Sequence, residues 1–364
     1  MRAARCFSIV ILIAFVISSS ALALPRFAAR TGAKCQSCHV NPTGAEMRQT
    51  FGVQYGRDQL PIPEWSKDFE MEDFSNLLTN VLGVGADFRT LYFSRKQDTL
   101  RTNGFFEMQG DIYLNFKVAK KISMFINKGL YSGFEIFGLL HILPAEGYIK
   151  IGKFIPAFGT KIDDHTTYIR MYTGFSPEFV RPERTGAEVA VSPGPFTVIG
   201  GFYNAADGFG AAQGKEKAFL GRGEGIFKLN DDTHFGLGAD IYQWQTLGGF
   251  STSLIGGMGS FSYKNYTVFG EVDQIKNNGL SGVTGIVAYV EGDIMVTQGV
   301  DLKVAYDFYD PDKDVKSGSL SRYSFGVEFF PISGVEVRPM YRIIKSEPVD
   351  KKDNEFDLII HFYL

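Results

Sequence analysis

A strict alternation of apolar and polar residues is the feature that most constrains this fold. It is clearest in the last eleven residues, where Phe356, Leu358, Ile360, Phe362 and Leu364 alternate with Asp357, Ile359, His361 and Tyr363. Successive side chains of a strand point to opposite faces, so this pattern predicts a strand with one apolar and one polar face. The same alternation recurs throughout residues 77–364, which we therefore expect to be all-β.

About sixteen such segments can be placed between turn-forming residues. The expected strands are 78–94, 104–118, 121–128, 132–142, 146–153, 185–193, 195–204, 217–229, 233–244, 251–263, 265–275, 283–296, 299–309, 319–330, 334–345 and 354–364. Tight turns alternate with longer polar loops, which is typical of outer-membrane barrels with periplasmic turns and extracellular loops. We predict a transmembrane antiparallel β-barrel, with a soluble β-sandwich as the alternative.

Composition agrees with a barrel and excludes some other classes. The chain has 33 Phe, 17 Tyr and 41 Gly, which suits many strands with glycine at tight packing points. After residue 23, no apolar run reaches the ~20 residues of a helical span. The net charge of −3, without a basic block, gives no indication of a nucleic-acid partner.

The N-terminus predicts export. Arg2 and Arg5 precede an apolar stretch at 7–16, and Ala21-Leu22-Ala23 has the pattern of a signal-peptidase site. We expect a signal peptide at 1–23, a haem-bearing segment at 24–76 and a barrel at 77–364. Cys6 would leave with the signal.

The haem assignment depends on Cys35-Gln36-Ser37-Cys38-His39, a C-x-x-C-H motif. In this motif the two thiols form thioethers to a c-type haem and the histidine is the proximal iron ligand. A zinc site would need about four ligands, and no second cysteine pair follows. A thioredoxin-like dithiol would need a βαβ context, which is absent.

The distal iron ligand stays open at this stage. Met47 lies eight residues after His39, on an expected short helix at 45–52 whose N-cap would be Thr43, with Glu46 completing a capping box. His165 could reach the iron from a long loop between the fifth and sixth strands, and Met71 is a weaker candidate. Met47 as an apolar contact and His165 as a solvated loop residue are the simpler interpretations.

That loop, residues 154–185, contains Asp163, Asp164, His165, Arg170, Arg181, Glu183 and Arg184. Loops this long are usually functional. In a barrel of this size it can fold inward and narrow the pore, or it can lie outside as a surface loop.

Taken together, the signal, the run Cys35 to Arg48 and the C-terminal barrel resemble the outer-membrane porin–cytochrome c fusions of iron-oxidising and metal-respiring bacteria. The resemblance implies that a small cytochrome plugs the barrel. It implies that Cys35 and Cys38 carry the haem and that His39 ligates its iron. Its implied partners are periplasmic carriers such as c-type cytochromes, an extracellular donor or acceptor such as iron, and outer-membrane lipid.

Three functions follow as hypotheses. The first is electron transfer across the outer membrane through one covalent haem, with Fe(II) oxidation as a possible reaction. The second is a diffusion porin whose haem is structural or sensory. The third is a soluble periplasmic cytochrome with a β domain. No nucleophile motif or phosphate loop supports a hydrolase or transferase.

Overall fold

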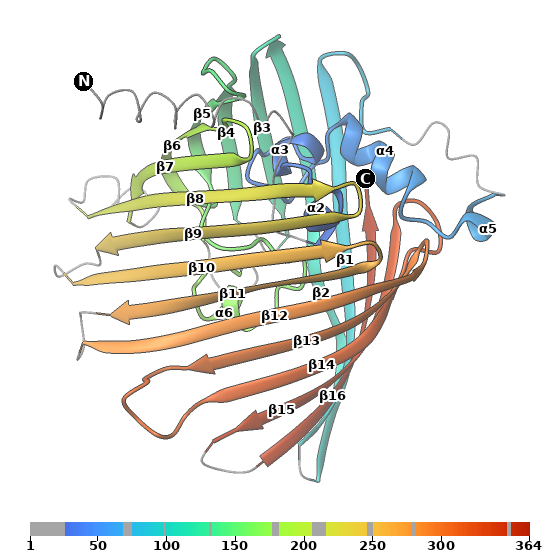
Figure 1. Ribbon diagram of the computed structural model, residues 1–364, viewed down its shortest axis with the longest axis vertical. Coiled ribbons are helices and arrows are strands. Elements are labelled where there is room, and N and C mark those ends of the chain that lie inside the picture. Colours follow the sequence, from blue (N-terminus) through green and yellow to red (C-terminus); the bar gives the residue numbers. More distant parts are fainter. Residues whose placement is uncertain are drawn as a thin grey trace, which may run out of the picture.

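The computed structural model describes residues 26–67, 75–97, 99–130, 133–176, 182–205, 216–245, 250–277, 282–347 and 351–364. Sixteen antiparallel strands form a closed barrel in which each strand pairs with its neighbours in sequence and β16 pairs with β1. Figure 1 shows the strands enclosing the helices α2 and α3 of the N-terminal segment. The expected signal peptide and Met71 lie outside the described residues.

The strand bounds agree with the prediction to within about four residues at either end. They are β1 Leu82–Gln97, β2 Leu100–Ala119, β3 Ile122–Gly129, β4 Phe134–Leu140, β5 Tyr148–Phe154, β6 Arg184–Val191, β7 Phe196–Asn204, β8 Lys217–Asn230, β9 Thr233–Gln245, β10 Ser251–Tyr263, β11 Tyr266–Asn277, β12 Val283–Thr297, β13 Val300–Asp310, β14 Leu320–Phe329, β15 Val335–Ser346 and β16 Lys351–Tyr363.

The barrel has an apolar outer face and a polar inner face, which excludes the soluble sandwich. On β16, Phe356 and Phe362 are exposed, whereas Asp357 and His361 are buried. The same holds on β11, where Val272 is exposed and Asp273 is fully buried. A closed barrel with an apolar exterior and a polar lumen is the form in which β-strands cross a bilayer. Within the described residues, none of the helices has the length and apolar character of a transmembrane helix.

The long connection between β5 and β6 folds into the lumen, as one of the two alternatives predicted. We call its described residues, 155–176 and 182–183, the lumen loop. Its backbone N–H groups at Ile155, Ala157, Gly159, Thr160 and Tyr168 donate to carboxylates on β4, β6, β9, β11 and β13 respectively. Acidic side chains pointing inward from five strands therefore hold this loop across the barrel interior.

Residues 26–67 contain four helices: α2 Arg26–Thr31, α3 Cys35–Cys38, α4 Thr50–Asp58 and α5 Pro63–Ser66. The lumen loop carries α6 Tyr168–Met171. We call residues 26–58 the plug, because α2 packs against β9, β10 and β11 from inside.

The helix expected at 45–52 is wrong. Ala45 and Glu46 have φ of 64° and 62°, the left-handed region that a right-handed helix cannot contain. Val40 N then donates to Met47 O and Gln49 N donates to Cys38 O, which closes a short antiparallel ladder. Glu46 accepts from Asn41 Nδ2 at 3.2 Å instead of completing a capping box with Thr43. The turn at Pro42-Thr43-Gly44 therefore leads into a hairpin, and α4 begins five residues later than predicted.

Candidate functional site in the barrel lumen

The plug is fastened to the ring of short turns that marks the periplasmic mouth. Lys34 Nζ contacts Glu146 Oε2 at 2.9 Å and donates to Ser192 O at 3.0 Å, on two different turns. Beyond α4, Gln298 donates to the carbonyls of Asp58 and Pro61 at 3.1 and 3.0 Å. These bonds come from turns distributed around the rim, so the C-x-x-C-H turn lies inside the mouth of the barrel.

Two arginines of α2 add charge pairs deeper in the wall. Arg26 forms ion pairs with Asp293 on β12, at 3.5 Å, and with Glu328 on β14. Arg30 pairs with Asp301 on β13 at 2.7 Å. All five side chains are almost fully buried, so each arginine neutralises carboxylates that would otherwise be costly in the lumen. The plug is thus part of the charge balance of the barrel.

The residues predicted to carry the haem are brought together on one turn. Cys35 and Cys38 are the first and last residues of α3, both thiols are free, and His39 N donates to Cys35 O at 2.9 Å. Cys35 and Cys38 are three residues apart in a helical turn and so share one face, and His39 follows in an extended conformation. Gly44, with φ of 86°, lies so close that a Cβ there would be 3.0 Å from Cys35 Sγ. The donor set and the tight glycine turn fit a thioether-bound c-type haem.

His39 is in the state that iron ligation requires. Burial, together with the nearby Arg48 guanidinium, lowers the pKa of His39 to about 4, so its imidazole is neutral at pH 7. The Nδ1 atom of His39 is buried and has no hydrogen-bond partner among the described residues. A neutral imidazole with an unpaired ring nitrogen is able to bind a metal ion.

Burial also keeps the two thiols protonated. It raises the pKa of Cys35 to about 12, with a further rise from Glu224 that Arg222 and Lys161 oppose. It raises the pKa of Cys38 as well, and Arg48 opposes that rise. A raised pKa is the opposite of the lowered pKa that makes a redox thiol reactive.

The two predicted distal ligands lie in different places. Met47 is 1% exposed and packs against Gly83 and Gly85 of β1. In the plug hairpin Met47 pairs with Val40 while His39 pairs with Arg48, so Met47 and His39 point to opposite faces of the ladder. His165 is buried in the lumen loop, with Nε2 3.5 Å from Arg89 Nη1 on β1. His165 is therefore buried, and its interpretation as a solvated loop residue is wrong.

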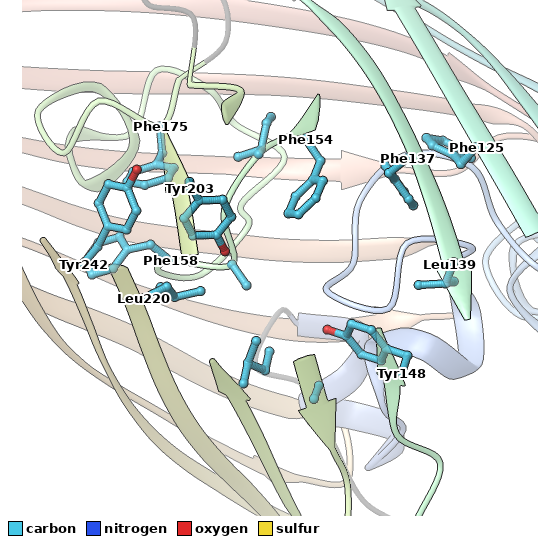
Figure 2. Packing of buried hydrophobic residues seen from close by; sticks show 14 of the residues in the cluster. Phe125, Phe137, Leu139, Tyr148, Phe154, Phe158, Phe175, Tyr203, Leu220 and Tyr242 are labelled. Atoms are coloured by element: carbon cyan, nitrogen blue, oxygen red, sulfur yellow. The ribbon is translucent and has the colours of Figure 1, made fainter. Parts of the chain in front are cut away.

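An aromatic lining connects the plug to the lumen loop. Val40 and Met47 of the plug belong to one apolar cluster with Phe125, Phe137 and Tyr148 of the wall and with Phe158 and Phe175 of the loop. Figure 2 shows these rings on the inner side of the strands, with Leu139 and Tyr148 beside the blue ribbon of the plug. This side of the lumen is apolar and packed.

On the opposite side of the lumen, ion pairs join the lumen loop to the barrel wall. Asp163 of the lumen loop pairs with Arg338 on β15 at 3.0 Å, and Asp164 pairs with Arg342 at 2.5 Å. Arg322 on β14 donates to Thr166 Oγ1 at 3.1 Å. The two aspartates could be identified from the sequence, but these three arginines could not. Alternation assigns them to the lumen, but only the strand register brings them to the loop.

A gap remains between the plug hairpin and the wall at β2–β4. It has a volume of about 460 Å³ and is lined by Arg48, Lys117, Lys120 and Lys121, with no carboxylate among the described residues that line it. Such a cationic space at the mouth would attract anions.

Comparison with known proteins supports the barrel. No family model and no curated protein matches the chain. Among solved structures, OmpT of Vibrio cholerae has a TM-score of 0.57 at 13% identity over 80% of this chain and 100% of its own. The outer membrane channel DcaP of Acinetobacter baumannii gives 0.56 at 9% identity, over 80% of this chain and 100% of its own. An anion-selective porin from Comamonas acidovorans gives 0.54 at 11% identity, over 78% of this chain and 99% of its own. With its apolar exterior and polar lumen, this chain is an outer-membrane β-barrel of the sixteen-stranded porin fold.

Proposed function

We propose that this outer-membrane barrel carries one covalently attached c-type haem in its lumen and passes electrons across the membrane through it. The observation that carries the proposal is the position of the C-x-x-C-H turn, which the plug holds inside the barrel mouth. Electron transfer weakens steeply with distance, and the apolar band of such a barrel is ~25 Å tall. A haem inside the lumen is better placed to serve partners at both mouths than one in the periplasm.

The chain's own residues have defined tasks in this proposal. Cys35 and Cys38 would hold the haem by thioethers and His39 would ligate its iron, which supplies a one-electron carrier. Lys161 of the lumen loop donates to Thr43 Oγ1 and to Gly44 O, both at 3.1 Å, and so ties the loop to the turn beside Cys35.

For the distal position we infer that Met47 is a packing residue. Its side chain lies against Gly83 and Gly85, on the face of the hairpin away from His39. Met47→Leu is therefore expected to leave the optical spectrum of the haem protein unchanged. A loss of the spectrum of a six-coordinate low-spin haem in that variant would assign the iron ligand to Met47.

The test uses the full chain in proteoliposomes that enclose an oxidised dye. A reductant that cannot cross the bilayer is added outside, and dye reduction is followed optically. We expect reduction by the wild-type protein and none by Cys35→Ala/Cys38→Ala, which cannot form thioethers. Equal rates in the two proteins would contradict the proposal, as would a purified wild-type chain without a haem absorption band.

A second function is a diffusion porin whose haem is structural or sensory. The comparisons favour this function over electron transfer, because the similar structures are an outer-membrane protein, an outer-membrane channel and a porin, and they bear on no cytochrome. The cationic gap of about 460 Å³ at the mouth favours it too and indicates small anions as the solutes. Liposome swelling with anionic and cationic solutes of equal size separates the two functions. Anion-selective swelling without dye reduction would support the porin.

Partners remain part of the proposal. Electron transfer requires a periplasmic carrier, for which a c-type cytochrome is the natural class, and an extracellular donor or acceptor such as iron. Dye reduction with Fe(II) outside, compared with a non-metal reductant, would tell whether the reaction includes Fe(II) oxidation.

A further inference from the structure

The barrel wall is much lower on one side than on the rest of its circumference. Five strands that follow one another around the barrel, β3, β4, β5, β6 and β7, have 8, 7, 7, 8 and 9 residues. The remaining strands have between 10 and 20 residues. In Figure 1 these short strands are green and stand next to the longer yellow β8. We call β3 to β7 the low arc.

The lumen loop accounts for much of the low wall. The chain leaves the wall after Phe154 and rejoins it at Arg184, with the lumen loop between these two residues. At the same end of the barrel, β3 ends at Gly129 and β4 begins at Phe134, so this connection is short as well. The residues that would have extended the wall at β5 and β6 therefore lie inside the barrel.

A strand of seven residues is too short for the apolar part of an outer membrane. At ~3.3 Å per residue, seven residues extend over about 23 Å, and a tilt of ~40° leaves a height of about 18 Å. The apolar band of such barrels is ~25 Å tall. By the same estimate, the 13 residues of β10 give a height of about 33 Å. The low arc is therefore shorter than the apolar band by about 7 Å, whereas β10 exceeds the band.

The outward side chains of the low arc are apolar, but over a narrow belt. On β5 the outward residues Ile149 and Ile151 are followed by Lys153, which faces outward because its neighbour Phe154 packs in the lumen. On β12, outside the low arc, outward apolar residues and glycine continue from Ile286 to Val296. The large apolar side chains exposed on the low arc are Ile122, Met124, Phe134, Ile151, Val189, Phe196, Val198 and Phe202.

Lipid alone fits this shape poorly. A wall shorter than the apolar layer either thins the bilayer locally or is covered by another protein surface. The low arc adjoins two long strands, β2 with 20 residues and β8 with 14. Lipid around a single barrel would therefore have to thin abruptly and recover within a few strands. A second low arc placed against the first removes this mismatch, because two walls of equal height then face each other.

The width of the low arc indicates how many copies fit together. Five of sixteen strands form about a third of the circumference. Two convex barrels touch along a single line, so a pair would cover only the middle of the arc. In a closed ring of three, each barrel meets two neighbours, and the strands between the two contacts face the central axis. Such a ring separates the whole low arc from lipid.

The area of the low arc is sufficient for a stable assembly. With ~4.8 Å between strands and a tilt of ~40°, five strands are about 31 Å wide. At the height of the arc this gives roughly 560 Å² of flat area per copy, which exceeds the ~500 Å² that one partner contributes to the smallest specific interfaces. Each copy divides this area between two neighbours, and closure of the ring makes the contacts reinforce one another.

Small residues create hollows among the large side chains of the low arc. Gly138 on β4, Ala187 on β6 and Gly200 on β7 all point outward. A Cβ at position 200 would meet no heavy atom within 4 Å. The exposed phenylalanine and isoleucine side chains of a neighbouring copy can therefore pack into these hollows.

We propose that this chain assembles in the outer membrane as a ring of three copies whose low arcs face the common axis. The contacts are head-to-tail, so the β3 side of one low arc meets the β7 side of the next. The proposal uses the wall of the barrel alone and does not depend on the haem, on electron transfer or on the passage of solutes.

The test is the protein mass of the purified full chain in detergent, measured by light scattering after gel filtration. Amine cross-linking in isolated outer membranes, before extraction, gives the same count in lipid and decides where the two differ. We expect particles of three chains. Gly200→Trp places a large side chain in the low arc and should lower the particle mass threefold, to one chain. Because tryptophan suits strands and membrane surfaces, this variant should fold, which heat-modifiable gel mobility checks.

Gly257→Trp on β10 is the matched control. Gly257 also points outward with no heavy atom within 4 Å of a Cβ, but it lies outside the low arc, so this variant should keep three chains. Cys35→Ala/Cys38→Ala should assemble as the wild-type chain does, which separates a failure of the haem proposal from a failure of this one. Any other number of chains in wild-type membranes would overturn the proposal. So would assembly that survives Gly200→Trp, or equal dissociation by Gly257→Trp.

Discussion

At the scale of single residues, the lumen depends on buried ion pairs, of which that of Lys150 is an example. Lys150 of β5 is fully buried, and its Nζ contacts Glu188 Oε2 at 2.6 Å and lies 4.1 Å from the centre of the Phe154 ring. Glu188 also accepts from Tyr203 Oη at 2.5 Å and from Ala157 N at 3.0 Å. A single lysine therefore neutralises the carboxylate that holds one end of the lumen loop.

Lys150→Met should destabilise the barrel by about 3–5 kcal/mol, because it leaves Glu188 buried without its counter-charge. Urea unfolding in lipid vesicles, followed by tryptophan fluorescence, measures the change. The double variant Lys150→Met/Glu188→Gln should regain most of the loss, since no charge is then stranded. If the double variant were as unstable as the single one, the lysine would act through packing on Phe154.

At the scale of elements, two ion pairs hold the lumen loop to β15, so substitutions that remove them should displace the loop. Asp163 and Asp164 hold it to Arg338 and Arg342. Asp163→Asn/Asp164→Asn should release the loop from β15 and raise the single-channel conductance in planar bilayers severalfold.

The control for the loop is Asp312→Asn/Asp314→Asn, which removes the same charge from an exposed turn outside the lumen. Its conductance should equal that of the wild-type chain. If both double variants raised the conductance equally, the cause would be net charge, and the loop would have no part in closing the pore.

Sequence patterns predicted the elements better than their contacts. Period-two alternation located all sixteen strands and assigned Asp357 and His361 to the lumen correctly, because alternation reports which face a residue occupies. It could not place Asp240 and Asp273 in one row across the sheet. That depends on the register of β10 with β9 and with β11, in both of which Gly256 is the paired residue. The helix expected at 45–52 failed since a local capping pattern was outweighed by the hairpin with residues 38–40.

At the scale of the whole molecule, the lipid-facing band should be intolerant of charge. Val272 lies near the middle of β11 and is 55% exposed on the outer face. Val272→Arg should cost about 2–4 kcal/mol of unfolding free energy in a bilayer. Val315→Arg, at a similarly exposed position between β13 and β14, should change the stability by no more than about 0.5 kcal/mol. Equal effects at the two positions would contradict the placement of β11 in the membrane.

The plug and the lumen loop both lie inside the barrel. Their contributions to closing the pore can be measured by removing each one separately. Deleting residues 24–66 removes the turn of Cys35 and every bond of the plug to the rim. It leaves the ion pairs of the lumen loop with Arg338 and Arg342 in place. We expect the deletion alone to raise conductance modestly. Combined with Asp163→Asn/Asp164→Asn, it should give the conductance of an open pore.

Arg26→Gln/Arg30→Gln is a milder change than the deletion. It removes the buried ion pairs that α2 forms with the barrel wall and keeps the chain intact. Its conductance should fall between those of the wild-type chain and the deletion variant. If the deletion alone opened the pore fully, the plug would be the single barrier. The haem proposed for it would then lie in the route of any solute, and conduction of electrons and diffusion of solutes could not operate in the same molecule at the same time.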